Sequence, residues 1–228
     1  SEAYVVTGDR AYARKAGILL DRVADLYPSF DFAQQAVIYE RRMGSAGYVS
    51  VWHDACEETR ELAQGYDTVF EALAEDAELV ALLRAQAARH GLENRKESFA
   101  DIRRNIEDRI LRDALTHVAK ISSNYPRTPI AVATIKAVLD WPDSRDEVYQ
   151  IIDDFLRRAT AVDGVTGEKG LANYSAFGLQ STAMFLAMWD RAIPGFLEEM
   201  LRRHPQLHDM YRFHVDTWCF TQYYPLVG

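Results

Sequence analysis

The spacing of apolar residues constrains the fold of this chain more than any other feature of its sequence. Apolar side chains recur every three or four residues in about nine segments, which is the period of helices with one buried face. No stretch alternates between polar and apolar residues for long enough to predict a β-strand. The sequence therefore predicts an all-α protein.

Proline, glycine and capping residues mark the ends of several predicted helices. Pro28 is expected to stop the first helix, Gly91 to close the third, and Ser98 to cap the fourth. Residues 29–51 show no sustained period and are expected to form a long connection. The predicted helices span residues 9–27, 52–74, 77–90, 98–121, 128–139, 144–161, 175–191, 194–203 and 207–219.

Two of these helix starts are predicted from short local motifs. Thr128 followed by Pro129 is expected to supply a cap and a proline at the first helical position. Ser144 and Glu147 have the spacing of a capping box, in which each side chain satisfies a backbone donor of the first turn.

The arrangement of the helices is predicted from the connections between them. Short connections favour antiparallel hairpins, stacked as an open solenoid or closed as an α/α toroid. The sequence contains no repeat of fixed period, which argues against a regular tetratricopeptide array. We therefore expect a single domain of stacked helical hairpins over residues 1–228.

Charge and composition exclude several classes of partner. The net charge of -8 gives no electrostatic reason to expect nucleic acid, since phosphate binding requires a dense basic surface. No apolar run approaches the roughly 18 residues of a membrane span, and no segment has the pattern of a signal peptide. We therefore expect no nucleic-acid partner and no membrane partner.

The cysteine and histidine residues do not have the spacing of a metal site. Cys56 and Cys219 lie far apart in the sequence and are expected to be two buried free thiols. His204 and His208 form a pair at helical spacing, but Pro205 interrupts their segment and no acidic residue completes a site. No metal site is predicted.

Two polar, turn-forming segments interrupt the helical pattern and are the candidate functional region. They are Ser-Ser-Asn-Tyr-Pro-Arg-Thr-Pro at residues 122–129 and Asp-Gly-Val-Thr-Gly-Glu-Lys-Gly-Leu-Ala-Asn-Tyr at residues 163–174. In these segments Asn124 offers two N–H donors that do not titrate, and Tyr174 offers a hydroxyl that can give or take a proton. The alternative roles are a turn former for Asn124 and a residue at the edge of the core for Tyr174.

Three segments of the chain resemble the helical domain of heparinase II/III-like polysaccharide lyases. They are Thr7 to Pro28, the helix from Trp52 to Asp67 that ends in Gln-Gly-Tyr-Asp, and Tyr-Ser-Ala-Phe-Gly-Leu-Gln-Ser at Tyr174 to Ser181. The resemblance implies an incomplete α/α toroid of antiparallel helical hairpins, whose C-terminal β-sheet domain lies outside this sequence. It also implies cleavage of an acidic polysaccharide, of the glycosaminoglycan or alginate type, by β-elimination at a uronic acid.

The same resemblance implies partners, cofactors and location. The partners are the acidic polysaccharide and the chain's own sheet domain, and the helical part alone is expected to be nearly inactive because the cleft lies between the two. No cofactor is expected in this domain, since the family's structural zinc site belongs to the sheet domain. A periplasmic or secreted location is implied, with a cytoplasmic location as the alternative. The net negative charge favours a uronate polymer without dense sulfation.

Two positions match the family's functional residues. Asn124 lies where the family has an asparagine that contacts the uronate carboxyl group, and Tyr174 lies where it has the catalytic tyrosine. Asn124 is followed by Tyr125 rather than by the histidine often found there. If that histidine acts as a base in the family, no residue of this chain can be assigned the same role from its position.

Five other residues are candidates for binding the substrate. Tyr125 is a candidate for a sugar subsite, although plain packing explains it equally well. A tyrosine base needs a nearby cation because its ordinary pKa is about 10, and Arg127 and Lys169 are the nearest candidates in sequence. His53 beside Trp52 is a candidate cleft residue, against capping or packing as the alternative.

Two other functions remain as alternatives. An α/α-toroid glycoside hydrolase would need an acid and a base carboxylate, for which Asp163 and Glu168 are the candidates. A non-enzymatic helical-hairpin scaffold for protein partners would need neither Asn124 nor Tyr174.

Overall fold

The structure, a computed structural model, describes residues 1–31, 53–160, 175–219 and 221–223. These residues are mostly helical, so the prediction of an all-α protein is confirmed. Among them, a short antiparallel hairpin joins β1 (Trp218–Cys219) to β2 (Gln222–Tyr223). No helix in this part of the chain is both long and apolar enough to cross a membrane.

The chain divides into two compact units. The first comprises Ser1–Ser123 with Thr134–Pro142, and the second comprises Asn124–Ala133 with Asp143–Gly228. Helix α8 (Arg127–Asp140) therefore contributes its first half to the second unit and its second half to the first. The single α/α toroid expected over the whole chain stays a prediction.

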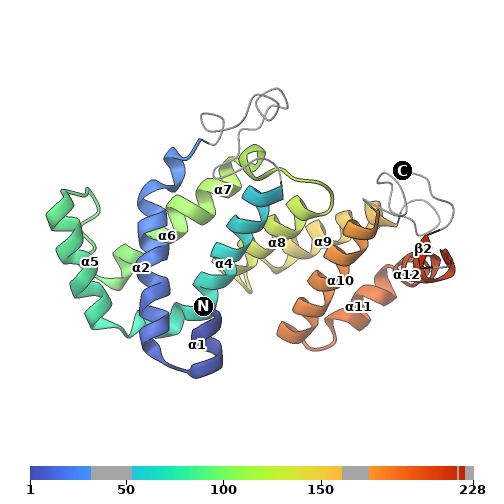
Figure 1. Ribbon diagram of the computed structural model, residues 1–228, viewed down its shortest axis with the longest axis horizontal. Coiled ribbons are helices and arrows are strands. Elements are labelled where there is room, and N and C mark those ends of the chain that lie inside the picture. Colours follow the sequence, from blue (N-terminus) through green and yellow to red (C-terminus); the bar gives the residue numbers. More distant parts are fainter. Residues whose placement is uncertain (32–52, 161–174, 220, 224–228) are drawn as a thin grey trace. The chain divides into compact units, whose positions relative to one another are not determined.

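The helices of the first unit follow one another along the chain in Figure 1. They are α1 (Glu2–Thr7), α2 (Arg10–Leu26), the 3-10 turn η1 (Tyr27–Ser29), α4 (His53–Ala74), α5 (Ala77–His90), α6 (Phe99–Ile106), the π-helical turn η3 (Glu107–Arg112), α7 (Asp113–Thr116) and the 3-10 turn η4 (Val118–Ile121). Helix α2 packs against α4, α5 and α6. The predicted boundaries of α2, α4 and α5 are confirmed to within one residue.

Helix α2 approaches α4 closely where it carries Gly17. A Cβ atom at this position would lie 2.7 Å from Cδ2 of the buried Leu73. Ala13, Leu20 and Ala24 are buried on the same face of α2. Small side chains on this face therefore allow the two helices to approach, and the larger side chains fill the space between them.

The helix ends of the first unit follow their local sequence. At α6 the Ser98 hydroxyl accepts the N–H of Asp101 at 3.3 Å, and the Asp101 carboxylate accepts the N–H of Ser98 at 3.1 Å, which completes a capping box. At the start of α5, Asp76 accepts the N–H of Leu79 at 2.9 Å. Gly91 ends α5 in the left-handed conformation, with φ of 62°, as predicted.

The helix predicted from residue 98 to residue 121 is not continuous. The π-helical turn η3 follows α6, α7 ends at Thr116, and the 3-10 turn η4 completes the segment. Apolar residues at helical spacing still form a buried stripe along this segment, namely Ile102, Ile106, Ile110, Ala114 and Ile121, whereas Val118, expected on the same stripe, is only half-buried. Leu111, which follows Ile110 in the π-helical turn and lies off that stripe, is buried as well.

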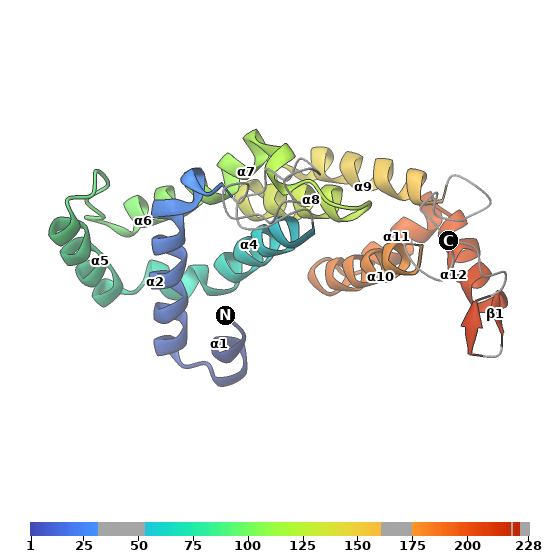
Figure 2. The ribbon, with the colours of Figure 1, turned by 45° about the horizontal axis from the view of Figure 1, so that its top comes forward.

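The second unit is built from the first half of α8, three further helices and the last helix with its hairpin. Its remaining helices are α9 (Arg145–Ala159), α10 (Ser175–Ala192), α11 (Phe196–Arg203) and α12 (Gln206–Asp216), and Figure 2 shows α12 leading into the hairpin. Aromatic rings fill the core of this unit. The ring centroids of Phe155 and Phe185 lie 5.3 Å apart, and those of Trp189 and Phe196 lie 5.5 Å apart.

Two predicted helix caps are wrong. Helix α8 begins at Arg127, one residue before the expected cap at Thr128, because the carbonyl of Pro126 already accepts the N–H of Ile130 in a four-residue helical bond. Ser144 precedes α9 but makes no side-chain cap hydrogen bond, so the capping box predicted with Glu147 does not form. The backbone of Ser144, at φ of -78° and ψ of 0°, lacks the extended conformation that a capping residue needs.

The predicted burial of the two cysteines is correct for one of them. Cys56 is a buried free thiol, as expected. The last helix ends at Asp216 rather than near residue 219, so Cys219 lies in β1 and its free thiol is exposed.

Candidate functional site

Asn124, Tyr125 and Arg127 lie in the turn that leads into α8. The backbone carbonyl of Asn124 accepts the N–H of Arg127 at 2.9 Å, and the carbonyl of Pro126 accepts the N–H of Ile130 at 3.2 Å. The peptide bond between Tyr125 and Pro126 is cis. Pro126 and Ile130 are buried and anchor the turn in the second unit, whereas Asn124 is only half-buried.

The Tyr125 hydroxyl is engaged within the protein. It donates a hydrogen bond to the backbone carbonyl of Phe155, near the end of α9. Phe155 is buried, and its ring packs edge-on against Phe185 of α10. The turn is thereby fastened to α9 by the side chain next to Asn124. The contact of Tyr125 with a sugar stays a prediction.

The Asn124 carboxamide is the polar group of this turn that is suited to a ligand. Among the described residues, none forms a hydrogen bond with this carboxamide. It therefore offers two N–H donors and one acceptor oxygen that binding would not have to withdraw from those residues. Arg127 is half-buried in the first turn of α8, where its charge and the positive end of the helix dipole both favour an anion.

The other predicted site residues are not placed by the structure. Tyr174, Lys169 and Trp52 lie outside the described residues. His53 is the first residue of α4, in the first unit, and its side chain also lies outside them. The structure therefore brings together the three candidates that are neighbours in sequence, and the remaining contacts stay predictions.

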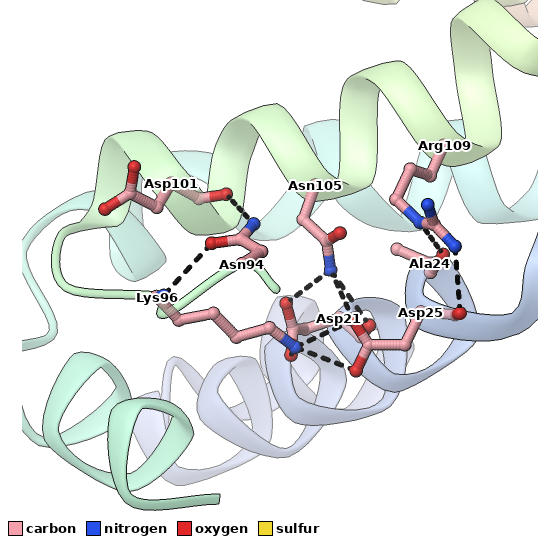
Figure 3. Close-up of polar contacts among 8 residues, drawn as sticks. All are labelled: Asp21, Ala24, Asp25, Asn94, Lys96, Asp101, Asn105 and Arg109. Atoms are coloured by element: carbon pink, nitrogen blue, oxygen red, sulfur yellow. Dashed lines mark hydrogen bonds and ion pairs between the residues drawn. The ribbon is translucent and has the colours of Figure 1, made fainter. Parts of the chain in front are cut away.

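A buried ion cluster in the first unit was not predicted from the sequence. Figure 3 shows the ammonium group of Lys96 between the carboxylates of Asp21 and Asp25, both on α2. Lys96 Nζ lies 2.5 Å from Asp21 Oδ2, and 2.9 and 2.8 Å from the two carboxylate oxygens of Asp25. The side chain of Lys96 is 2% exposed. All three N–H donors of the ammonium group therefore have carboxylate acceptors in the protein interior.

Asn105 of α6 completes this cluster. Its amide nitrogen lies 2.9 Å from Asp21 Oδ1 and 2.9 Å from Asp25 Oδ1. Burial raises the pKa of the Asp21 carboxyl group, while its hydrogen bonds to Lys96 and Asn105 act in the opposite direction. Nearby, Arg109 donates to the backbone carbonyls of α2 residues Ala24 and Asp25 at 2.8 and 3.0 Å. Arg109, an exposed residue of η3, therefore also holds the end of α2.

The backbone around Lys96 holds its side chain in place. Lys96 has a positive φ of 54°, which is uncommon for a residue with a side chain. Asn94 supports this conformation: its side-chain oxygen accepts the N–H of Lys96, and its amide donates to the carbonyl of Asp101, both at 3.0 Å. Because the ammonium group and both carboxylates have partners within the cluster, we interpret it as a cross-link of α2, α6 and the loop between α5 and α6.

A second polar cluster joins α9 to α11 in the second unit. His204 Nε2 lies 2.6 Å from Asp153 Oδ1, and Arg203 forms an ion pair with the same carboxylate. His204 is buried and His208 is exposed, so the two histidines considered as a pair lie in different environments. Within the part of the chain that the structure describes, no group of three or more His, Cys, Asp or Glu residues is placed to hold a metal ion.

Comparisons with protein-family models, with curated proteins and with solved structures find no match to this chain. The resemblance to heparinase II/III-like lyases therefore rests on the sequence motifs given above.

Proposed function

We propose that this chain is the helical portion of a polysaccharide lyase that cleaves a uronate-containing polysaccharide by β-elimination. The observation that carries the proposal is the half-buried Asn124 carboxamide, which no described residue engages, at the positive end of α8. The sequence resemblance places the family's carboxyl-binding asparagine at this position. The all-α fold is consistent with the helical domain that the resemblance implies.

The reaction would use Asn124 to make the proton on C5 of the uronate easier to remove. Removal of that proton places negative charge on the adjacent carboxylate, the C4–O bond then breaks, and a double bond forms between C4 and C5. Donors aimed at the carboxylate stabilise this charge, and each preorganised donor typically contributes about 3–4 kcal/mol. A neutral amide serves this purpose because it does not titrate with the substrate.

The departing oxygen on C4 needs a proton, and Tyr174 is proposed to supply it or to remove the proton from C5. An ionised tyrosine would require a nearby cation, and Arg127 and Lys169 are proposed for that role. The substrate cleft would be completed by the C-terminal sheet domain, with Tyr125, His53 and Trp52 as further contacts. The carboxylates considered for a hydrolase, Asp163 and Glu168, lie outside the described residues, so no structural observation favours that alternative.

The test is the ultraviolet absorbance of the unsaturated uronate that β-elimination leaves on the product. The full-length protein should be assayed on alginate, heparan sulfate, chondroitin and hyaluronan, beside the variants Asn124→Ala and Tyr174→Phe. Asn124→Ala should lower kcat/KM by roughly a hundredfold or more. Ser122→Ala, an exposed polar residue of the same segment, is the matched control and should leave the rate unchanged. Absence of an absorbance rise on every polymer would refute the proposal, and release of reducing ends without it would favour a hydrolase.

A further inference from the structure

Tyr125 joins the turn before α8 to α9 through its side chain. Its backbone directly follows Asn124, and its hydroxyl reaches the carbonyl of Phe155 in α9, 30 residues further along the chain. The side chain is half-buried, and its bond to Phe155 shows that it extends from the turn to α9. A tyrosine hydroxyl needs a partner when it is buried, and here the partner is a rigid backbone group.

The helix that accepts this bond leads into the segment that carries the other proposed site residue. Phe155 lies one turn before the end of α9, which ends at Ala159. Residues 161–174 follow, and α10 begins at Ser175, directly after Tyr174. Phe155 also packs against Phe185 of α10, so both helices that border this segment are joined at the point where Tyr125 binds. All of these groups belong to the second unit.

We propose that Tyr125 is a positioning residue for the elimination reaction: its hydrogen bond to Phe155 fixes the turn so that the Asn124 carboxamide is held against the uronate carboxylate. This inference rests on the proposed function. A small displacement of a group that stabilises the transition state lowers the rate strongly, because such contacts depend on distance and orientation. A positioning role therefore acts mainly on kcat, and it does not require Tyr125 to touch the substrate.

Tyr125→Phe is the sharpest variant, because it removes one oxygen atom and leaves the ring in place. We expect kcat to fall about ten- to a hundredfold, with KM changed less than about threefold. Replacing Tyr125 with p-aminophenylalanine, which keeps a donor at the same position, should restore most of the rate. Tyr211→Phe is the matched control, because Tyr211 also donates to a helix carbonyl of the same unit, that of Leu179 at 3.5 Å. Its kcat should equal that of the wild type.

A purely structural role of Tyr125 has a different signature. It would lower the unfolding temperature and the folded fraction but leave kcat per folded molecule unchanged, and that result overturns the inference. A kcat of Tyr125→Phe equal to that of the wild type would do the same, while leaving the proposed function intact.

A second measurement separates the inference from the proposed function. NMR can record the side-chain amide resonances of Asn124 in the wild type and in both tyrosine variants. These resonances report the local environment of the carboxamide whether or not the protein turns over a substrate. They should shift in Tyr125→Phe and stay constant in Tyr211→Phe. Wild-type inactivity on every polymer would refute the proposed function. Unchanged Asn124 resonances in Tyr125→Phe would overturn the positioning role in either case.

Discussion

Replacing Lys96 with methionine would remove the cation from the buried cluster and keep a side chain of similar length. The ammonium group makes three contacts of 2.5 to 2.9 Å with carboxylates and is almost fully excluded from water. Its loss leaves two buried or nearly buried carboxylates, Asp21 and Asp25, without a counter-ion. Removing one partner of a buried ion pair typically costs about 3–5 kcal/mol. Asn105 still donates to both carboxylates, so we expect the lower part of this range.

The pH dependence of this loss follows from the carboxyl group of Asp21. Burial raises its pKa in the folded state, so its contribution to stability is present below the unfolded pKa of about 3.9 and is lost as pH rises through the folded value. Without Lys96 the folded pKa should rise further, because the cation that lowers it is absent. The difference in unfolding free energy between wild type and variant should therefore be smallest under acidic conditions and grow toward neutral pH.

Hydrogen exchange, measured by mass spectrometry at a series of urea concentrations, can show which helices lose stability when Lys96 is replaced. Peptides from α2 and α6 should lose protection, whereas those from α10 and α12 act as an internal reference in the second unit. Lys15→Met, at an exposed lysine of α2, is the control and should change stability by less than about 1 kcal/mol. Adding Asp21→Asn to the Lys96 variant should regain part of the loss, because one unpaired charge is removed. A loss below about 1 kcal/mol would contradict the reasoning, because the cluster would then behave like an exposed ion pair.

Two further predictions concern other parts of the fold. Gly17→Ala should destabilise the first unit by about 1–3 kcal/mol, because the added Cβ atom would lie 2.7 Å from Leu73. Gly65→Ala should stabilise the same unit by about 0.5–1 kcal/mol, because alanine favours the helix and the nearest atom, Ser1 Oγ, lies 3.7 Å from the added Cβ. Equal effects of the two substitutions in urea unfolding would show that helix propensity outweighs the contact. Burial lowers the pKa of His214 below 6.5, so its contribution to stability is present above that value and is lost as pH falls through the folded pKa. Thermal unfolding of His214→Leu should show a smaller loss of stability on acidification than the wild type; identical pH profiles would exclude this role.

Helix ends were predictable where the residues that set them, such as caps and C-terminal glycines, act within one helical turn. Helix α5 begins and ends where the sequence indicates, because Asp76 caps its first turn and Gly91 adopts the left-handed conformation just beyond its last. Ser144 shows the limit of such motifs. It has the right neighbours for a capping box, but its backbone dihedrals do not allow the side chain to reach the first turn. A motif therefore predicts a cap only where the chain enters the helix in an extended conformation.

The candidate site was predictable to the extent that it is local. Asn124, Tyr125 and Arg127 belong to one turn, and the prolines and polar residues around them indicate that turn directly. The bond from Tyr125 to Phe155 was not predictable, because it depends on how α8 and α9 pack. The same holds for Lys96, whose partner Asp21 lies 75 residues away in sequence. No sequence pattern distinguishes a buried lysine and aspartate at that separation from charged residues on the surface.

Apolar spacing and turn residues alone predict that this protein is all-α, where most of its helices lie, and which turn holds Asn124. These properties depend on apolar periodicity, capping and turn formation, and each of them acts over a few neighbouring residues. Helix packing, in contrast, buries Lys96 between two carboxylates, brings the Tyr125 hydroxyl to α9 and leaves Cys219 exposed. The physical reason is that burial and long-range hydrogen bonding depend on which helix faces meet, and many pairings are compatible with the same local pattern.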